Sequence, residues 1–320
     1  MKGRDLLTLA DLSASEIHQI LDTAKSLKSA KHAQAGSVPA ADDRPLVGHT
    51  LAMIFEKPSL RTRATFAIGM QQLGGQVVDL AAEHLQMGVR ETVPDVAQNL
   101  ERWVDVIMAR VFAHSTLEVL AEHASIPIIN GLSDYTHPCQ ILADVLTMQE
   151  HKGELSSRKI AYIGDGYNVA NSLLFGAGKL GYHLAVGCPE GYLPPDDIIA
   201  RAHGLAKQSG ATLELCSDPI AAVRDADVLY TDSWVSMGLE AEAAERERVF
   251  PPFQVNTELL SYARSDAIVM HCLPAHRGME ITDEVMDGPQ SVVFDQAENR
   301  LHAQKAVLLE LLVGGVPQSH

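Results

Sequence analysis

Short apolar runs of strand length alternate with amphipathic helical patterns along most of this chain. We interpret these runs as strands: 50–55, 104–108, 126–129, 159–163, 183–186, 212–215, 228–231, 267–270 and 292–294. Continuous apolar strands with helices between them are typical of parallel sheets that helices cover on both faces. The sequence therefore predicts an α/β protein built from doubly wound parallel sheets.

The length of the chain favours two domains. It has 320 residues, of which 46% are hydrophobic, whereas a single core rarely extends beyond about 250–300 residues. A polar stretch, Lys152–Arg158, follows a helical pattern at 138–151 and marks the change of domain. We predict a first domain over residues 1–150, a second over 151–296, and a C-terminal helix at about 297–315 that packs back onto the first.

Charge and composition exclude several classes of partner. The formal net charge is −16, which disfavours binding to nucleic acid and to anionic membranes. No apolar run approaches the roughly 20 residues that cross a bilayer, and Met1–Asp5 has no apolar core of the signal-peptide type. The four cysteines are far apart and suggest neither a disulfide framework nor a structural zinc. We therefore expect a cytoplasmic protein that acts on small molecules.

The segment Phe55–Arg63 combines two hydroxyls and two guanidiniums where a predicted strand turns into a helical pattern, Arg61–Leu73. The first N–H groups of a helix lack internal partners and lie at the positive end of its dipole. Ser59, Arg61 and Thr62 would therefore converge on a phosphate at this helix start. The alternative is an ordinary capped helix with solvated arginines, which needs only one hydroxyl.

Two further polar groups are predicted at the same edge of the first sheet. Arg110 ends the strand that begins at Val104, and His137 opens the helix that follows the strand at 126–129. Because the carboxyl ends of parallel strands share one edge, both side chains should lie near Arg61. A packed or capping histidine is the alternative for His137.

Gly164-Asp165-Gly166 follows a predicted strand and has the first two glycines of a dinucleotide-binding fingerprint. Val169 replaces the third glycine, and about 20 residues further on only Glu190 offers a carboxylate for a ribose. A tight strand-to-helix turn explains the two glycines equally well. A Rossmann-type, nucleotide-dependent oxidoreductase therefore stays a distant alternative.

Four motifs follow predicted strands in order along the chain. They are Ser59-Leu60-Arg61-Thr62-Arg63, His137-Pro138-Cys139-Gln140, Asp232-Ser233-Trp234-Val235-Ser236-Met237-Gly238 and His271-Cys272-Leu273-Pro274-Ala275-His276-Arg277-Gly278. Together they resemble the aspartate/ornithine carbamoyltransferase family, and its ornithine type in particular, and the similarity runs to about Leu312. Leu60 departs from the usual threonine and is similar to the acetylornithine type, so acetylornithine or another amine stays an alternative substrate.

The resemblance implies a reaction and its setting. The expected reaction transfers the carbamoyl group of carbamoyl phosphate to the δ-amine of L-ornithine, giving L-citrulline and phosphate, with no metal and no organic cofactor. The active site is expected in the cleft between the two domains. A homotrimer or a multiple of trimers is expected, with Gln86 completing the active site of an adjacent subunit.

The resemblance also assigns residues. Those expected to bind carbamoyl phosphate are Ser59, Leu60, Arg61, Thr62, Gln86, Arg110, His137, Pro138, Cys139, Gln140, Cys272, Leu273 and Arg300, the last at the start of the final helix. Those expected to bind ornithine are Asn168, Asp232, Ser236 and Met237. Catalytic roles are expected for Arg110, His137, Asp232 and Cys272.

The residue types fit this chemistry. Attack of an amine on the carbonyl group builds negative charge on its oxygen, which donors such as Arg110 and His137 would stabilise. His271 and Cys272 are not expected to form a nucleophilic pair, because adjacent side chains of an extended segment point to opposite sides. In the loop after 228–231, Trp234 is expected to be exposed beside the amino-acid site.

Overall fold

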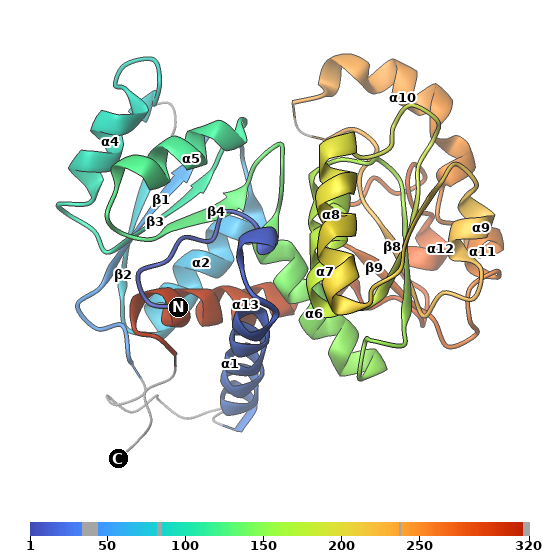
Figure 1. Ribbon diagram of the computed structural model, residues 1–320, viewed down its shortest axis with the longest axis horizontal. Coiled ribbons are helices and arrows are strands. Elements are labelled where there is room, and N and C mark those ends of the chain that lie inside the picture. Colours follow the sequence, from blue (N-terminus) through green and yellow to red (C-terminus); the bar gives the residue numbers. More distant parts are fainter. Residues whose placement is uncertain (34–43, 82–84, 237, 316–320) are drawn as a thin grey trace. The chain divides into compact units, whose positions relative to one another are not determined.

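The computed structural model describes residues 1–33, 44–81, 85–236 and 238–315, which form two compact units. The first unit consists of Met1–Leu146 and the chain from Glu298 onward, and the second of Thr147–Ala297. The chain passes between the units within two helices, α6 (Pro138–Lys152) and α13 (Val293–Leu312). Each unit is a parallel sheet flanked by helices, as Figure 1 shows, so the predicted α/β class is confirmed.

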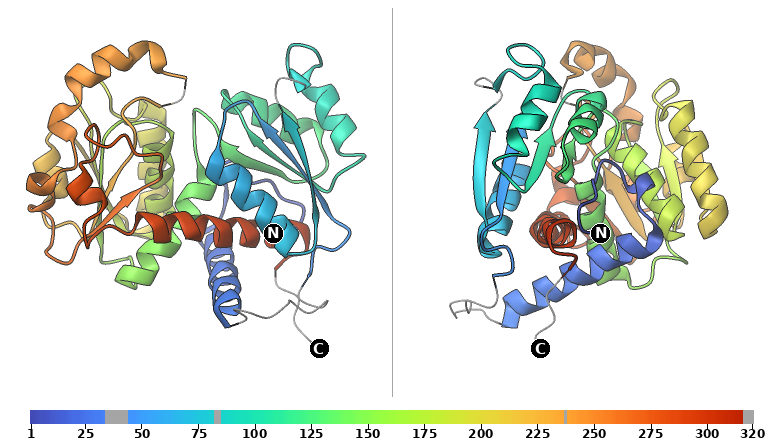
Figure 2. Two further views of the ribbon diagram at one scale, coloured as in Figure 1. Left: turned by 180° about the vertical axis from the view of Figure 1, so that it is seen from behind. Right: turned by 60° about the vertical axis from the view of Figure 1, so that its left-hand side comes forward.

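The sheet of the first unit has four parallel strands in the order β2-β1-β3-β4. The strands are β1 (Thr50–Phe55), β2 (Gln76–Ala81), β3 (Val106–Arg110) and β4 (Ile128–Leu132). Helices α4 (Val93–Leu100) and α5 (His114–His123) bury their apolar residues against one face. Helix α2 (Leu60–Gln72) lies beside α13, where Gly69 faces the side chains of Leu301 and Lys305 (Figure 2).

The sheet of the second unit has five parallel strands in the order β7-β6-β5-β8-β9. They are β5 (Lys159–Ile163), β6 (His183–Gly187), β7 (Leu213–Cys216), β8 (Val228–Thr231) and β9 (Ile268–His271). Helices α9 (Pro219–Val223), α11 (Thr257–Leu260) and α12 (Asp283–Met286) form a core with one face. Helices α7 (Asn168–Leu180) and α8 (Asp196–Ser209) cover the other, and α10 (Ala243–Val249) follows the loop after β8 (Figure 1).

Side-chain caps fix where several helices begin. Ser13 and Glu16 form a capping box at the start of α1 (Ala14–Ala33): the Glu16 N–H donates to the Ser13 hydroxyl and the Ser13 N–H donates to the Glu16 carboxylate. The Asp218 carboxylate accepts the N–H groups of Ile220 and Ala221 at the start of α9. Three 3₁₀ turns complete the described elements, at Leu9–Asp11, Glu240–Glu242 and Pro251–Phe253.

One strand prediction is wrong, and one strand was not predicted. The run at 292–294 is not a strand, because the chain only bridges β9 at Ser291 and then enters α13 at Val293. Conversely, β2 carries polar residues such as Gln76 and Asp79 and lies at the sheet edge, where neither face is deeply buried. An edge strand of this kind has no continuous apolar run. In the described part of the chain, we find no helix with the length and apolar character needed to span a membrane.

Candidate active site

Both sheets have a point at which the strand order reverses. In the first unit the chain adds β2 on one side of β1 and then β3 on the other, and in the second it adds β6 and then β8 on opposite sides of β5. In open parallel sheets, ligands bind beyond the carboxyl ends of the two strands at such a point. The loops after β1 and β3, and those after β5 and β8, are therefore the candidate binding loops.

The loop after β1 forms a helix N-terminus that can hold an anion. Ser59 caps α2, since its side-chain oxygen accepts the N–H of Thr62 at 3.2 Å, and its hydroxyl proton can donate elsewhere. Leu60 is the first residue of α2, and its side chain is 77% exposed. Arg63 has a structural role instead, because it pairs with Asp79 of β2 and lies over the ring of Phe55. Ser59 can therefore cap α2 and bind an anion at the same time.

Arg300 lies inside α13 and not at its start, which corrects the sequence-based placement. The side chain is 2% exposed, and it donates to Thr62 Oγ1 at 3.1 Å and to Gln140 Oε1. The amide group of Gln140 in turn donates to Asp144 at 2.8 Å. A buried guanidinium therefore links α13 to the first turns of α2 and α6.

Arg110 and His137 are both buried at this edge. Arg110 is the last residue of β3, and His137 immediately precedes α6. Burial, together with the positive charges of Arg300, Arg110 and Arg61, holds the pKa of His137 well below its ordinary value of 6.5. His137 is therefore a neutral imidazole near pH 7, surrounded by cations that favour an anion.

Cys139 and Gln86 differ from the other predicted anion ligands. The Cys139 thiol is buried and points to the carbonyl oxygen of Asn130 at 3.5 Å, and burial raises its pKa to about 12. Any contact from Pro138–Cys139 to a ligand must therefore come from the start of α6 and not from the thiol. Gln86 is exposed, with a left-handed backbone (φ 45°), in a turn that precedes α4.

Glu56, which sequence reasoning missed, joins the loops after β1 and β3. Its own N–H donates to the carbonyl oxygen of Arg110 at 2.9 Å, and its carboxylate accepts the N–H of Phe112 at 2.8 Å. The residue thereby holds the chain on both sides of Arg110. Glu56 lies in the loop after β1, but its partners lie more than 50 residues away and could not be read from the sequence of that loop.

In the second unit, Asp232 and Cys272 meet at the carboxyl ends of β8 and β9. The Cys272 Sγ donates to Asp232 Oδ1 at 2.8 Å, and the same oxygen accepts the N–H of Ser233 at 2.7 Å. The two side chains are therefore in direct contact. Leu273 follows with a left-handed backbone (φ 58°).

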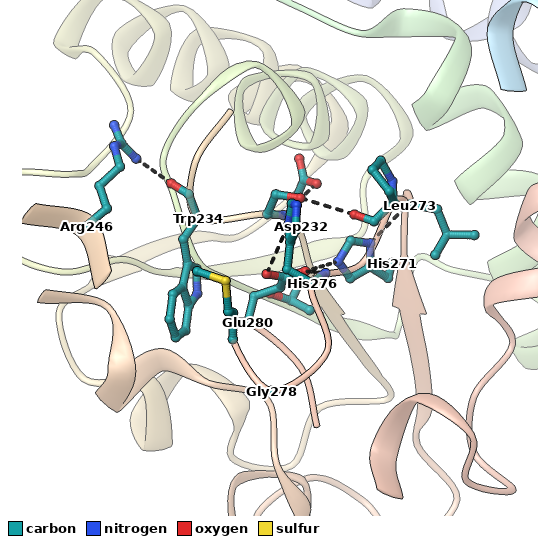
Figure 3. Close-up of polar contacts among 12 residues, drawn as sticks. Asp232, Trp234, Arg246, His271, Leu273, His276, Gly278 and Glu280 are labelled. Carbon is teal, nitrogen blue, oxygen red and sulfur yellow. Dashed lines mark hydrogen bonds and ion pairs between the residues drawn. The ribbon is translucent and has the colours of Figure 1, made fainter. Parts of the chain in front are cut away.

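His271 faces away from this pair toward the buried Glu280. Its Nε2 lies 3.1 Å from Glu280 Oε1, and its Nδ1 accepts the N–H of Leu273 at 2.8 Å (Figure 3). Since Nδ1 must accept, Nε2 carries the proton. Potential ligand atoms of Asp232, His271 and Cys272 lie within 4.8 Å of one another, but the Nδ1 lone pair of His271 already accepts the Leu273 N–H.

The remaining predicted amino-acid ligands lie in the loops after β5 and β8. Asn168 is the buried first residue of α7, and Ser236 is half-buried. Met237 lies outside the described residues. Trp234 is 4% exposed and packs against Phe250, with ring centroids 5.8 Å apart, so the prediction of an exposed Trp234 is wrong.

Together, these features define a two-unit parallel α/β protein with a candidate anion site lined by cations in one unit and a carboxylate and thiol in the other. Comparisons with known proteins identify its family. The description "Aspartate/ornithine carbamoyltransferase, carbamoyl-P binding domain" matches residues 4–150, and "Asp/Orn binding domain" of the same family matches 156–311. The chain belongs to the aspartate/ornithine carbamoyltransferase family.

Individual relatives match over nearly the full length. An ornithine carbamoyltransferase from Pyrococcus horikoshii is 54% identical over 99% of this chain and 98% of its own. A relative from Pyrococcus furiosus, described as anabolic, is 53% identical over the same shares. The solved structure of ornithine carbamoyltransferase from Pyrococcus furiosus superposes with a TM-score of 0.93, at 53% identity and 98% coverage of both chains.

Proposed function

We propose that this enzyme transfers the carbamoyl group of carbamoyl phosphate to the δ-amine of L-ornithine, giving L-citrulline and phosphate. The observation that carries the proposal is the cluster of Arg110, His137 and Arg300 around the start of α2, within a chain whose full-length relatives are named for this activity. The domain descriptions support an assignment of residues 1–150 to carbamoyl phosphate and 151–296 to ornithine.

The first half-site has the groups that the leaving phosphate requires. Ser59, Arg61 and Thr62 offer a hydroxyl, a guanidinium and main-chain N–H groups at a helix start, which favour a dianion. Arg300 adds a buried positive charge beside Thr62. We assign the phosphate of carbamoyl phosphate to this helix start.

Arg110 and His137 act on the carbonyl oxygen in this proposal. The attacking nitrogen forms a bond to the carbonyl carbon, negative charge develops on the oxygen, and the C–O bond to phosphate then breaks. A neutral His137 carries one ring N–H group, which can donate a hydrogen bond to that oxygen. The proton that leaves the amine is taken up by the departing phosphate or by solvent.

The second half-site supplies groups for the amine. Asp232 is the carboxylate that accepts from the δ-amine, and Cys272, 2.8 Å away, lies beside the same group. An amine with a solution pKa of about 10.4 must be neutral to attack, so the site has to bind the uncharged form. Asn168, Ser236, Met237 and Leu273 stay proposed substrate contacts.

The structure disfavours the dinucleotide alternative. A Cβ atom on Gly166 would lie 2.4 Å from Tyr192 O and from Pro194 N, so the chain's own backbone occupies the approach that a pyrophosphate uses in a nucleotide fold. The glycine serves this internal contact, and the Gly166 N–H donates to Tyr192 O at 2.9 Å.

An assay with a panel of amines tests the proposed substrate. Carbamoyl phosphate is incubated with L-ornithine, N-acetyl-L-ornithine, putrescine or L-aspartate, and the carbamoylated products are quantified by mass spectrometry. Ornithine should give the highest kcat/KM. A preference for any other amine would overturn the proposal, and acetylornithine is the main rival because of Leu60.

We further propose a cytoplasmic homotrimer, or a multiple of trimers, in which Gln86 completes the active site of an adjacent subunit. The exposed Gln86 in its left-handed turn supports this role, because nothing about the turn itself requires a glutamine. The anabolic relative supports a place in arginine biosynthesis.

Subunit mixing tests the shared site. Inactive Gln86→Ala chains reassembled with inactive Arg61→Ala chains should regain partial activity, since some interfaces then pair two intact residues. Failure to complement despite proven subunit exchange, or an active monomer, would refute the shared site.

A further inference from the structure

The guanidinium of Arg246 contacts three loops at the carboxyl edge of the second sheet. Its Nη1 lies 2.7 Å from Asp165 Oδ2 in the loop after β5, and it donates to the carbonyl oxygen of Trp234, after β8, at 2.8 Å (Figure 3). Its Cζ lies over the ring of Tyr192, in the loop after β6, 5.0 Å from the ring centroid. Arg246 itself belongs to helix α10, so it reaches these loops from outside the sheet.

These contacts span the point where the strand order of the second sheet reverses. Strands β5 and β8 are neighbours there, and their loops carry the proposed ornithine ligands. Asp165 precedes Asn168 by three residues, and Trp234 follows Asp232 by two. The Arg246 side chain therefore fixes the spacing between the loops after β5 and β8, which are proposed to bind the amino acid.

Burial makes the arrangement rigid. Arg246 is 5% exposed, and its Nε donates to Glu242 Oε2 at 3.0 Å, which holds the guanidinium plane on the α10 side. The side chain of Asp165 is similarly buried: 7% of it is exposed, against 6% for that of Arg246. Removing one partner of a buried pair leaves an uncompensated charge, so the loops would have to rearrange.

We propose that Arg246 is a positioning residue for the amino-acid substrate, which holds the Asp165–Asn168 and Asp232–Ser236 loops at the spacing that ornithine requires. It does not touch the substrate itself. The inference rests on the proposed function for the identity of the amine, but not for its geometry. An error of about 1 Å in the placement of binding groups costs roughly 100-fold in rate.

If Arg246 only anchored α10, the kinetic consequences of replacing it would be different. Loss of such an anchor would lower the stability or the amount of active enzyme, and it would change the apparent kinetics toward both substrates alike. A positioning role raises the KM for the amine and leaves the KM for carbamoyl phosphate unchanged, because carbamoyl phosphate is assigned to the first unit.

The test compares steady-state kinetics of the full-length enzyme and its variants, measured with the amine that the wild type prefers. Arg246→Met should raise the KM for that amine by about 10-fold or more and change the KM for carbamoyl phosphate less than about twofold. Arg246→Lys keeps the charge without the planar fork and should recover part of the loss. Arg248→Met, on the exposed side of the same helix, is the matched control and should behave like the wild type.

Asp165→Asn and the double variant with Arg246→Lys keep the test decisive where Arg246→Met does not fold. If the two residues act through one another, their combined effect on the KM for the amine should be smaller than the product of the single effects. Strictly multiplicative effects, equal rises in both KM values, or an unchanged KM for the amine in Arg246→Met would each overturn the proposal. A wild type that prefers another amine counts against the proposed function alone, because the KM ratios still test Arg246.

Discussion

Each unit has a parallel sheet with one strand-order reversal, and the two units carry opposite charge beside it. In the first, Arg61 and Arg110 from the loops at the strand-order reversal and Arg300 from α13 lie around a neutral His137. In the second, the corresponding loops present the carboxylates of Asp165 and Asp232. We infer that the strand-order reversal determines where a substrate binds, and that the charge of the side chains determines whether it is an anion or an amine.

The residue that joins the two loops differs in the same way. In the first unit it is an acid, Glu56, which holds the chain around Arg110. In the second it is a base, Arg246, which holds Asp165 and Trp234. In each unit the joining residue carries a charge opposite to that of the side chains proposed to bind the substrate. It therefore orders those side chains without competing with them for the substrate.

Arg61→Ala should give the largest effect, because it removes a cation from the phosphate side of this comparison. We expect kcat/KM for carbamoyl phosphate to fall by about 100-fold or more, with an unchanged melting temperature. Arg61→Lys should recover little, since lysine lacks the planar fork that binds two oxygens. Retention of more than about a tenth of wild-type kcat/KM would show that Arg61 does not bind the phosphate.

Asp232→Asn should act on the other side, with a smaller loss. We expect kcat/KM for ornithine to fall about 30-fold while the KM for carbamoyl phosphate stays within about twofold, because a carboxylate that accepts from the amine is replaced by a neutral amide. Steady-state kinetics with each substrate varied in turn measure both values. An equal rise in both KM values would contradict the division of the substrates between the units.

The pH dependence of stability should have opposite signs in the two units. Burial and three arginines lower the folded-state pKa of His137 below 6.5, so the unfolded chain binds more protons there and stability falls as the pH drops below 6.5. Burial raises the pKa of Asp165 from 3.8 to about 6, against the opposing effect of Arg246, so its contribution is present below 3.8 and is lost as the pH rises through 6.

Urea unfolding between pH 4.5 and 7.5 measures these contributions. His137→Gln should reduce the gain in unfolding free energy with rising pH by up to about 1.4 kcal/mol per pH unit, and Asp165→Asn should increase it. The exposed His18→Gln serves as the control for the loss of a histidine. Slopes that change in the same direction in both variants would break the comparison.

Leu60→Thr should have the smallest effect. The side chain is 77% exposed at the first position of α2, so the residue serves a ligand only through its N–H group. We expect the KM for carbamoyl phosphate to change less than about threefold, with the order of preferred amines unchanged. A switch to acetylornithine or away from it would show that position 60 reads the amine.

Local patterns predicted much of this architecture, because the information is local. The apolar runs mark the strands β1, β5 and β8, and Ser59 marks the start of α2 within the phosphate loop. The edge strand β2 was missed, since its residues do not form an apolar run. The final helix was placed several residues late, because Val292–Phe294 has the composition of a buried strand.

The residues that join the loops could not be predicted. Arg246 follows Asp165 by 81 positions and sits among acidic residues on a short helix, a context typical of a solvated surface. Its role appears only once three loops meet in space. Trp234 was misjudged for the same reason, because Phe250, which covers it, lies beyond the next helix.

The close contact at Gly166 has a consequence for protein engineering. The backbone from Tyr192 to Pro194 is pressed so closely against this glycine that no side chain fits between them. The segment fills the space beside the turn after β5, where the pyrophosphate of a dinucleotide binds in nucleotide-binding sheets. Adding phosphate-binding residues to the second unit would therefore achieve nothing until this segment was shortened, and Gly166→Ala would displace the segment without creating a new function.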